Sequence, residues 1–94
     1  MPSSIASFEE FDRLLQQART DIAALHVEMP DDQPLHSVHL QLDALHAWTR
    51  NGRKPAQDEK DRLNFGLIAS RNLDDLCPDV CAVLYRLASY VIYW

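Results

Sequence analysis

Three of the four histidines of this sequence lie in one stretch, LHSVHLQLDALH at residues 35–46, together with an aspartate. Both residue types can bind metal ions or transfer protons. His39, Asp43 and His46 follow one another at spacings of four and three, which places them on one flank of a helix. Neighbouring members could share an ion, but His39 and His46 are about 10 Å apart along the helix axis. One metal ion could not bind all three without strain.

This row of side chains has three interpretations. It can be a polar border beside a buried apolar face, a surface for contact with another protein, or part of a metal site that another helix completes. The metal site is the least favoured, because both the HExxH spacing of zinc enzymes and the repeated Glu-x-x-His of di-iron bundles are absent. We therefore expect no metal site and no bound cofactor.

The sequence also lacks the patterns of other catalytic or nucleic-acid sites. Gly52 and Gly66 are the only glycines, so there is no glycine-rich loop to hold a phosphate. The acidic pairs at 9–10 and 31–32 are typical of helix starts. The net charge of −5 argues against nucleic acid as a partner, and the basic residues at 50–54 are too few to form its binding surface. We expect no catalytic residues.

Apolar residues recur at helical spacing throughout the chain. Ser7 and Glu10 form the pattern of a capping box at a helix start, and Asn51-Gly52 is typical of a left-handed helix end. The sequence therefore predicts a single all-α domain over residues 1–94, an antiparallel bundle of about four helices. The expected helices cover roughly residues 8–28, 33–50, 56–71 and 78–92.

Two of these helices carry unusual residues. Gly66 lies inside the third predicted helix, where it costs roughly 1 kcal/mol relative to alanine, so we expect a close neighbour at that point. The fourth predicted helix is apolar over more than one face, which favours either a central position or an aromatic surface for a partner. Cys77 and Cys81 lack the CxxC spacing and are expected to be reduced, half-buried thiols.

The pattern of the first residues bears on the expected location. MPSSIASFEE lacks the charged start and apolar run of a signal peptide. No apolar run approaches the length needed to span a membrane. The expected location is the cytoplasm, with no membrane partner.

A longer pattern runs through residues 61–91, DRLNFGLIASRNLDDLCPDVCAVLYRLASYV. It consists, in order, of Arg62-Leu63, Gly66, Ile68-Ala69, Asp74-Asp75, Pro78-Asp79 and the residues from Tyr85 to Tyr90. Together with Phe11-Asp12-Arg13 and Gln41-Leu42 upstream, this pattern resembles the small helical immunity proteins of the type VI secretion system that neutralise an NAD(P)+ glycohydrolase toxin. The histidines, both cysteines and the length of the NGRKPAQ loop lie outside the pattern.

The resemblance implies a cytosolic protein without enzymatic activity that binds a cognate effector toxin and blocks its active site or the entry of its substrate. Contact residues vary among such proteins, so none is transferred from the resemblance. The candidate contacts come instead from the predicted second and fourth helices: His39, Asp43, His46, Trp48, Tyr85, Tyr90 and Tyr93. The alternative is a small helical adaptor, or a homodimer joined through the aromatic end of the fourth helix.

Overall fold

Every regular element in residues 5–94, the part of the chain that the computed structural model describes, is a helix. The helices are α1 (Phe8–Glu28), α2 (Gln33–Trp48), α3 (Gln57–Asp61), α4 (Phe65–Ile68) and α5 (Pro78–Tyr93), with a 3₁₀ turn η1 (Arg50–Gly52) and a π-helical turn η2 (Ala69–Leu73). The predicted all-α fold is confirmed. None of the helices in this range has the combination of length and apolar character that crossing a bilayer requires.

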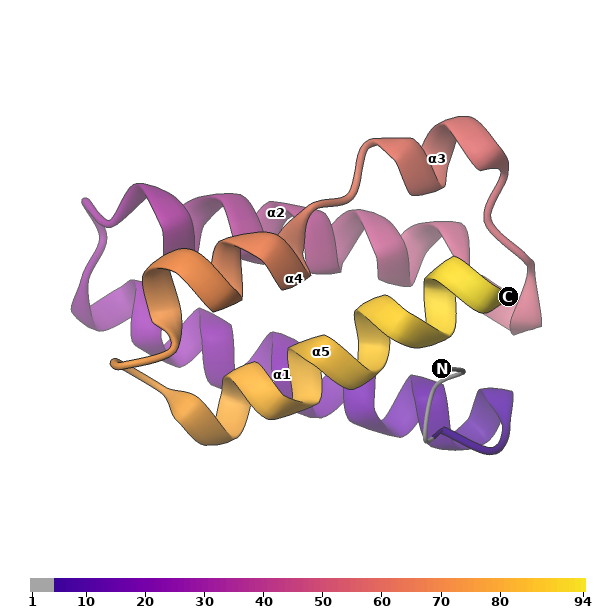
Figure 1. Cartoon of the computed structure of the whole chain (residues 1–94), viewed down its shortest axis with the longest axis horizontal. Helices are drawn as coiled ribbons and strands as arrows, with labels where there is room; N and C mark the ends of the chain where they lie inside the picture. The colour runs from indigo at the N-terminus through magenta and orange to yellow at the C-terminus, as the bar shows by residue number, and fades with distance from the viewer. Residues whose placement is uncertain (1–4) are drawn as a thin grey trace.

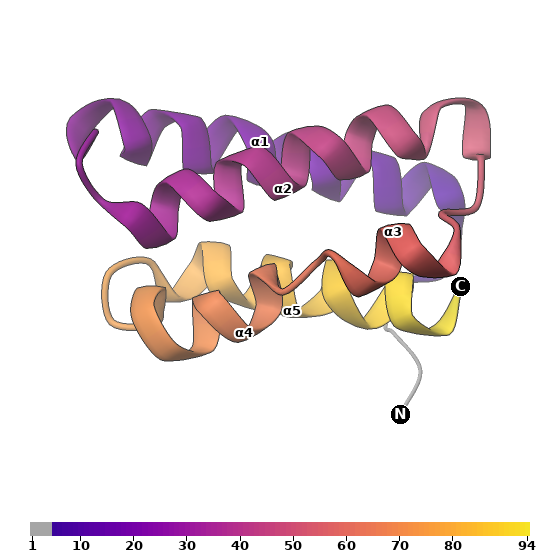
Figure 2. The same cartoon turned by 90° about the horizontal axis from the view of Figure 1, so that it is seen from above.

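The helices form two layers, which Figures 1 and 2 show from the front and from above. The hairpin of α1 and α2 makes one layer, and α4, η2 and α5 make the other. α1 packs on both α2 and α5, while α2 packs on α4 and η2. Successive long segments run in opposite directions, so the bundle is antiparallel, and α3 lies beside its upper edge in Figure 1.

The helix ends form as their residues predict. The Ser7 hydroxyl accepts a hydrogen bond from the Glu10 amide at 3.2 Å and caps α1. Asp32 caps α2 in the same way, accepting from the Leu35 amide at 2.9 Å. After α2, Asn51 and Gly52 both adopt the left-handed backbone conformation, with φ of 61° and 80°.

The third predicted helix, 56–71, is wrong as a continuous element, because the structure divides it into α3 and α4–η2. α3 has no buried residue, whereas α4 buries Phe65 in the core. Asn64 lies at the break and is bound by Gln41 of α2. The Gln41 side chain accepts from the Asn64 amide at 2.7 Å and donates to its side-chain oxygen at 2.6 Å. These bonds to a distant residue interrupt the helix at Asn64. The spacing of apolar residues along the chain could not predict them.

The core lies between the two layers and draws on all the longer segments. Its fully buried large side chains include Phe11, Leu15 and Ile22 of α1, Leu35, Leu42 and Leu45 of α2, Phe65 and Leu73 of the α4–η2 segment, and Leu84 and Leu87 of α5. These residues are the apolar stripes expected from helical spacing. Burying each one stabilises the fold by roughly 1.5–3 kcal/mol relative to leaving it exposed.

Candidate functional site

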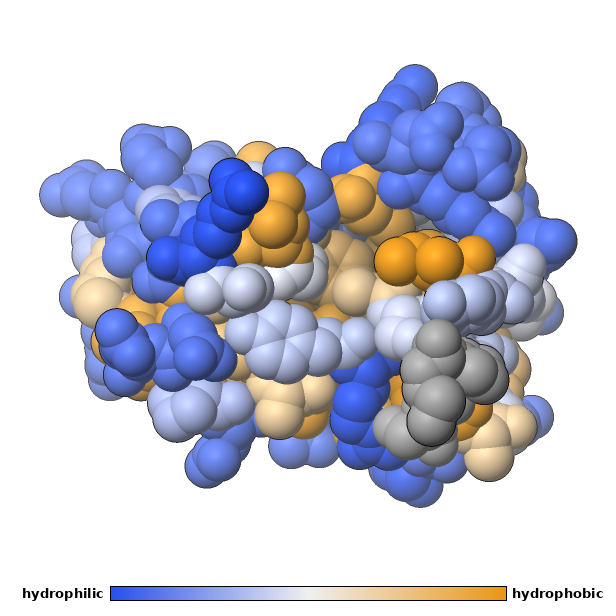
Figure 3. All heavy atoms as spheres, in the orientation of Figure 1, coloured by the Kyte–Doolittle hydropathy of each residue, from blue (hydrophilic) through white to orange (hydrophobic). Residues whose placement is uncertain are grey.

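An apolar groove opens on the outer face of the molecule, between the α3–α4 segment and α5. In Figure 3 apolar side chains gather in this hollow, below the polar surface of α3. The groove encloses about 310 Å³ and is lined by Leu63, Phe65, Leu67, Ala88, Val91 and Ile92, together with Gly66 and the polar residues Lys60 and Asn64. We call this feature the apolar groove.

The closeness of α4 and α5 at the base of the groove depends on Gly66. A Cβ added to Gly66 would lie 3.1 Å from the Ala88 Cβ, closer than most side-chain contacts allow. The close neighbour expected beside Gly66 is therefore confirmed, and it is Ala88. Two small residues facing each other bring the helices together at this point and leave no side chain to fill the space outside them.

The rim of the groove exposes large apolar side chains to solvent. Leu67 is 50% exposed and Ile92 is 68% exposed, and Tyr93, next to Ile92 on α5, is 61% exposed. The Lys60 ammonium, from α3, donates a hydrogen bond to the Trp94 carbonyl at 3.3 Å and so joins α3 to the end of α5. Leu67 and Ile92 were not among the contact residues predicted from the sequence, because both lie off the buried stripes and carry no reactive group.

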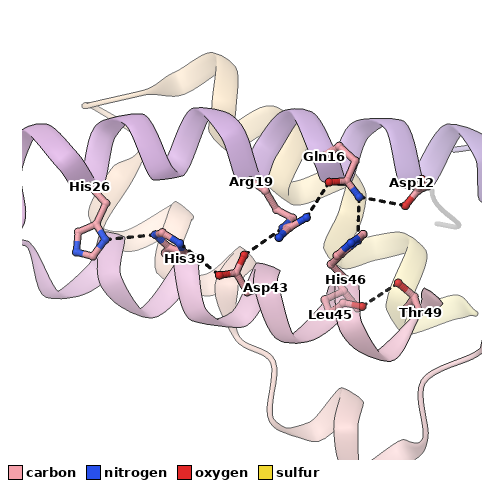
Figure 4. A network of polar contacts seen from close by, with 9 residues as sticks. All are labelled: Asp12, Gln16, Arg19, His26, His39, Asp43, Leu45, His46 and Thr49. Carbon is pink, nitrogen blue, oxygen red and sulfur yellow. Dashed lines mark hydrogen bonds and ion pairs between the residues drawn. The ribbon is translucent and has the colours of Figure 1, made fainter.

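The predicted row of His39, Asp43 and His46 lies along the boundary between α2 and α1, as Figure 4 shows. Asp43 accepts from the Arg19 guanidinium at 3.0 Å, and Arg19 in turn donates to the Gln16 side chain at 2.8 Å. The Gln16 amide lies 2.8 Å from His46 Nδ1. We call the full chain of contacts the polar seam: Asp12, Gln16, Arg19, His26, His39, Asp43 and His46.

At its other end the seam brings together histidines from two helices. His26, in the last turn of α1, places its Nδ1 3.3 Å from Nδ1 of His39. His36 lies on the other side of His26, with ring centroids 5.2 Å apart. Spacing within one helix identified the row on α2, but it could not place His26 against His39.

The aromatic candidates lie in three different surroundings. Tyr90 stacks on Phe11 at a centroid distance of 4.8 Å and contacts Trp94, so it ties α5 to the start of α1. Tyr85 is at the surface and donates to Asp74 at 3.1 Å. Trp48 is half-buried at the end of α2, where its carbonyl accepts from Arg53 at 2.7 Å. Tyr93 remains the most exposed of the four.

The two cysteines are buried thiols at the start of α5, where Cys77 is the N-cap residue. Cys81 donates to the Ala69 carbonyl at 3.8 Å and Cys77 to the Leu73 carbonyl at 3.5 Å. Burial raises the pKa of Cys77, and it raises the pKa of Cys81 to about 12. Both thiols are therefore protonated at neutral pH and are poor nucleophiles.

The chemistry available to residues 5–94 is that of binding. Every buried side-chain nitrogen and oxygen in this range has a hydrogen-bond partner, so none of them is available to bind a ligand without breaking an existing bond. No group of three or more histidine, cysteine or acidic side chains among the described residues is arranged around a metal position. Burial under a binding partner would be most favourable for the exposed apolar surface of the groove.

Comparison with known proteins identifies a family. A family model described as Tsi6 matches residues 7–92, nearly the whole chain. Curated proteins and solved structures show no match to it.

Proposed function

This chain belongs to the Tsi6 family of type VI secretion immunity proteins, and from that premise we propose that it binds and inhibits a cognate effector toxin. The toxin would be an NAD(P)+ glycohydrolase, because the pattern of residues 61–91 resembles immunity proteins against that activity. A toxin that consumes NAD(P)+ acts where the dinucleotide is, so we place the encounter in the cytoplasm. The immunity protein itself would carry out no reaction.

The apolar groove carries the proposal for the contact surface. Its rim exposes Leu67 and Ile92, whose side chains are hydrated in the free protein and would be buried under a partner. Anchors of this kind, surrounded by polar residues that exclude water, contribute most of the affinity in protein interfaces. The exposed Tyr93 and Tyr85 on α5 extend the same helix surface and are included.

Four of the other candidates contact residues of α1 or α2 inside the bundle. His39, Asp43 and His46 contact one another or α1 through the polar seam, and Tyr90 packs on Phe11. We assign these four to the stability of the bundle rather than to the toxin. Since the protein has a net charge of −5, the toxin surface that meets it is expected to be basic around an apolar centre.

Inhibition is tested with purified toxin domain and its NAD(P)+ hydrolysis. The variants Leu67→Asp and Ile92→Asp place a charge on the groove rim and should each weaken inhibition by roughly thirty-fold or more, the loss typical of an interface anchor. Val27→Asp is the matched control, because Val27 is 81% exposed on α1 and does not line the groove. Circular dichroism checks that all three remain folded.

Two results would contradict this assignment. If the wild-type chain leaves the toxin fully active, it is not the immunity protein of that toxin. If light scattering shows a dimer that Ile92→Asp dissociates while inhibition is unchanged, the groove joins two copies of this chain, as the adaptor or homodimer alternative requires.

A further inference from the structure

Two polar side chains, Lys60 and Asn64, line the apolar groove, and Lys60 is the only charged one among the described residues that line it. Its ammonium donates a hydrogen bond to the Trp94 carbonyl at 3.3 Å, which holds the charge beside the end of α5. An ammonium has three N–H donors and no acceptor, and the Trp94 carbonyl accepts from one of the three. A ligand in the groove therefore meets a positive charge that still has donors to offer.

Asn64 adds further donors to the same groove. Its side-chain oxygen accepts from the Gln41 amide at 2.6 Å, and its backbone N–H donates to the Gln41 oxygen at 2.7 Å. The polar group that the Asn64 side chain can offer a ligand is therefore its NH₂, which donates. Both polar side chains of the groove thus present donors, while the other side chains that line it are apolar.

These donors restrict which partner can cover the groove. Removing an ammonium from water without a counter-charge is unfavourable, and this cost offsets the gain from burying Leu67 and Ile92. A basic group would be repelled by Lys60, and a purely apolar group would leave the ammonium without a new partner. A carboxylate next to an apolar group avoids both costs, because an ammonium and a carboxylate form a charge-assisted hydrogen bond.

The size of the groove limits the apolar group to one large side chain. Its volume of about 310 Å³ lies at the lower end of ligand sites, which run from about 300 to 1,000 Å³. Since Gly66 and Ala88 carry no large side chain, an aromatic ring can lie against α4 and α5 at this point. Aromatic side chains are also enriched among the anchors of protein interfaces. The groove therefore fits an aromatic anchor with a neighbouring carboxylate.

We propose that the groove binds a segment of the toxin in which an aromatic side chain lies next to a carboxylate, and that Lys60 selects the carboxylate. This inference rests on the proposed function for the identity of the partner. The ring would fill the groove, and the carboxylate would accept from Lys60 and Asn64. The toxin surface around this segment can still be basic, because the net charge of −5 acts over the whole molecule and Lys60 acts within the groove.

The chemistry of the groove is tested without the toxin, with 3-phenylpropionate as the probe and 3-phenylpropylamine as its cationic counterpart. Each is titrated into the protein, and the methyl resonances of Leu67, Val91 and Ile92 report binding by NMR. The acid should bind roughly fivefold or more tightly than the amine. The net charge of −5 would favour the amine instead, so a preference for the acid identifies a local positive charge.

Variants of two lysines identify the charge. Lys60→Gln should remove most of the preference for the acid, and Lys60→Arg, which keeps the charge, should retain it. Lys54→Gln is the matched control, because Lys54 is exposed in the loop before α3 and does not line the groove. It should bind both probes like the wild type. Circular dichroism of each variant separates loss of the site from loss of the fold.

Equal binding of the two probes, a preference for the amine, or no binding of either probe overturns this inference. So does a preference for the acid that Lys60→Gln leaves unchanged. These results are distinct from failure of the proposed function. If the acid is preferred but the wild-type chain leaves the toxin fully active, the site stands and the proposed function fails. If the chain inhibits the toxin without preferring the acid, the proposed function stands and this inference fails.

Discussion

The cleft beside the polar seam and the apolar groove have nearly equal volumes and opposite chemistry. The cleft beside the seam encloses about 330 Å³ and is lined by Gln16, Arg19, Thr20, Ala23, His39 and Asp43, while the groove encloses about 310 Å³ among aliphatic side chains. In the seam, polar groups pair with one another. At the groove, Leu67 and Ile92 leave half or more of their surface exposed to solvent.

The difference shows which surface gains more from a protein partner. A partner at the seam would have to replace hydrogen bonds that already exist, so the net gain is small. A partner over the groove removes apolar area from water, at roughly 25 cal/mol for each Å² covered. The groove is therefore the better binding site for a protein, although the two hollows have nearly equal volumes.

The largest expected effect concerns the buried thiol of Cys81 in α5. Because the pKa of Cys81 is raised to about 12, its thiolate population at neutral pH is about a thousandfold below that of an ordinary cysteine. Thiol reagents should therefore label Cys81 far more slowly in the folded protein than in the urea-unfolded chain. Labelling followed by mass spectrometry of the peptide that holds Cys81 measures both rates, and rapid reaction of Cys81 in the folded chain would mean that the helices around it open readily.

The pKa of these thiols also gives the sign of a pH effect. The folded state holds Cys77 and Cys81 in the neutral form, so it binds their protons more tightly than the unfolded state does. Their contribution to stability is complete below the ordinary thiol pKa and is lost as the pH rises above it.

The next largest effect is expected where α4 and α5 approach. Gly66→Val should destabilise the protein by about 1–3 kcal/mol. The Cβ of the new valine would lie 3.1 Å from the Ala88 Cβ, and its methyl groups add further bulk at this close contact. Urea denaturation measures the change. The pair Gly66→Ala and Ala88→Gly provides the control: together they should be less destabilising than the sum of the two single changes. If the effects of the two single changes simply add, the contact between residues 66 and 88 does not limit how closely α4 and α5 pack.

A smaller effect is expected in the polar seam. Arg19→Gln removes the ion pair between Arg19 and Asp43. The Arg19 side chain is 30% exposed and that of Asp43 is 46% exposed, so solvent already weakens their attraction. The loss of unfolding free energy should not exceed about 1 kcal/mol. Arg13→Gln, at an exposed position of the same helix, is the reference in the same urea titration. A loss as large as that of Gly66→Val would make the seam, not the helix approach, the more important contact.

The smallest effect concerns Glu59 on α3, beside the groove. Its carboxylate accepts from the Ala56 amide at 2.8 Å and pairs with Arg53 at 3.0 Å, and these contacts lower its pKa. This lowered pKa stabilises the fold above the ordinary glutamate value, and the contribution disappears as the pH falls through the folded value. The melting temperatures of wild type and Glu59→Gln should differ slightly at neutral pH and converge in acid. A difference that persists in acid would point to another cause.

Much of the fold follows from local signals in the sequence. The capping residues Ser7 and Asp32, the turn at Asn51-Gly52 and the apolar stripes of α1, α2 and α5 all depend on neighbours within a few positions. The prediction failed at Asn64, where the two bonds to Gln41 come from a residue 23 positions away.

The sequence by itself determined the helices, their buried faces and the row of His39, Asp43 and His46, because a helix brings residues three and four apart together. Only the tertiary structure decided what those faces meet. The contacts of His26 with His39 and of Gly66 with Ala88 join different helices. Their distances depend on how two helices pack, which is set by side-chain shapes along the whole interface and not by any local pattern.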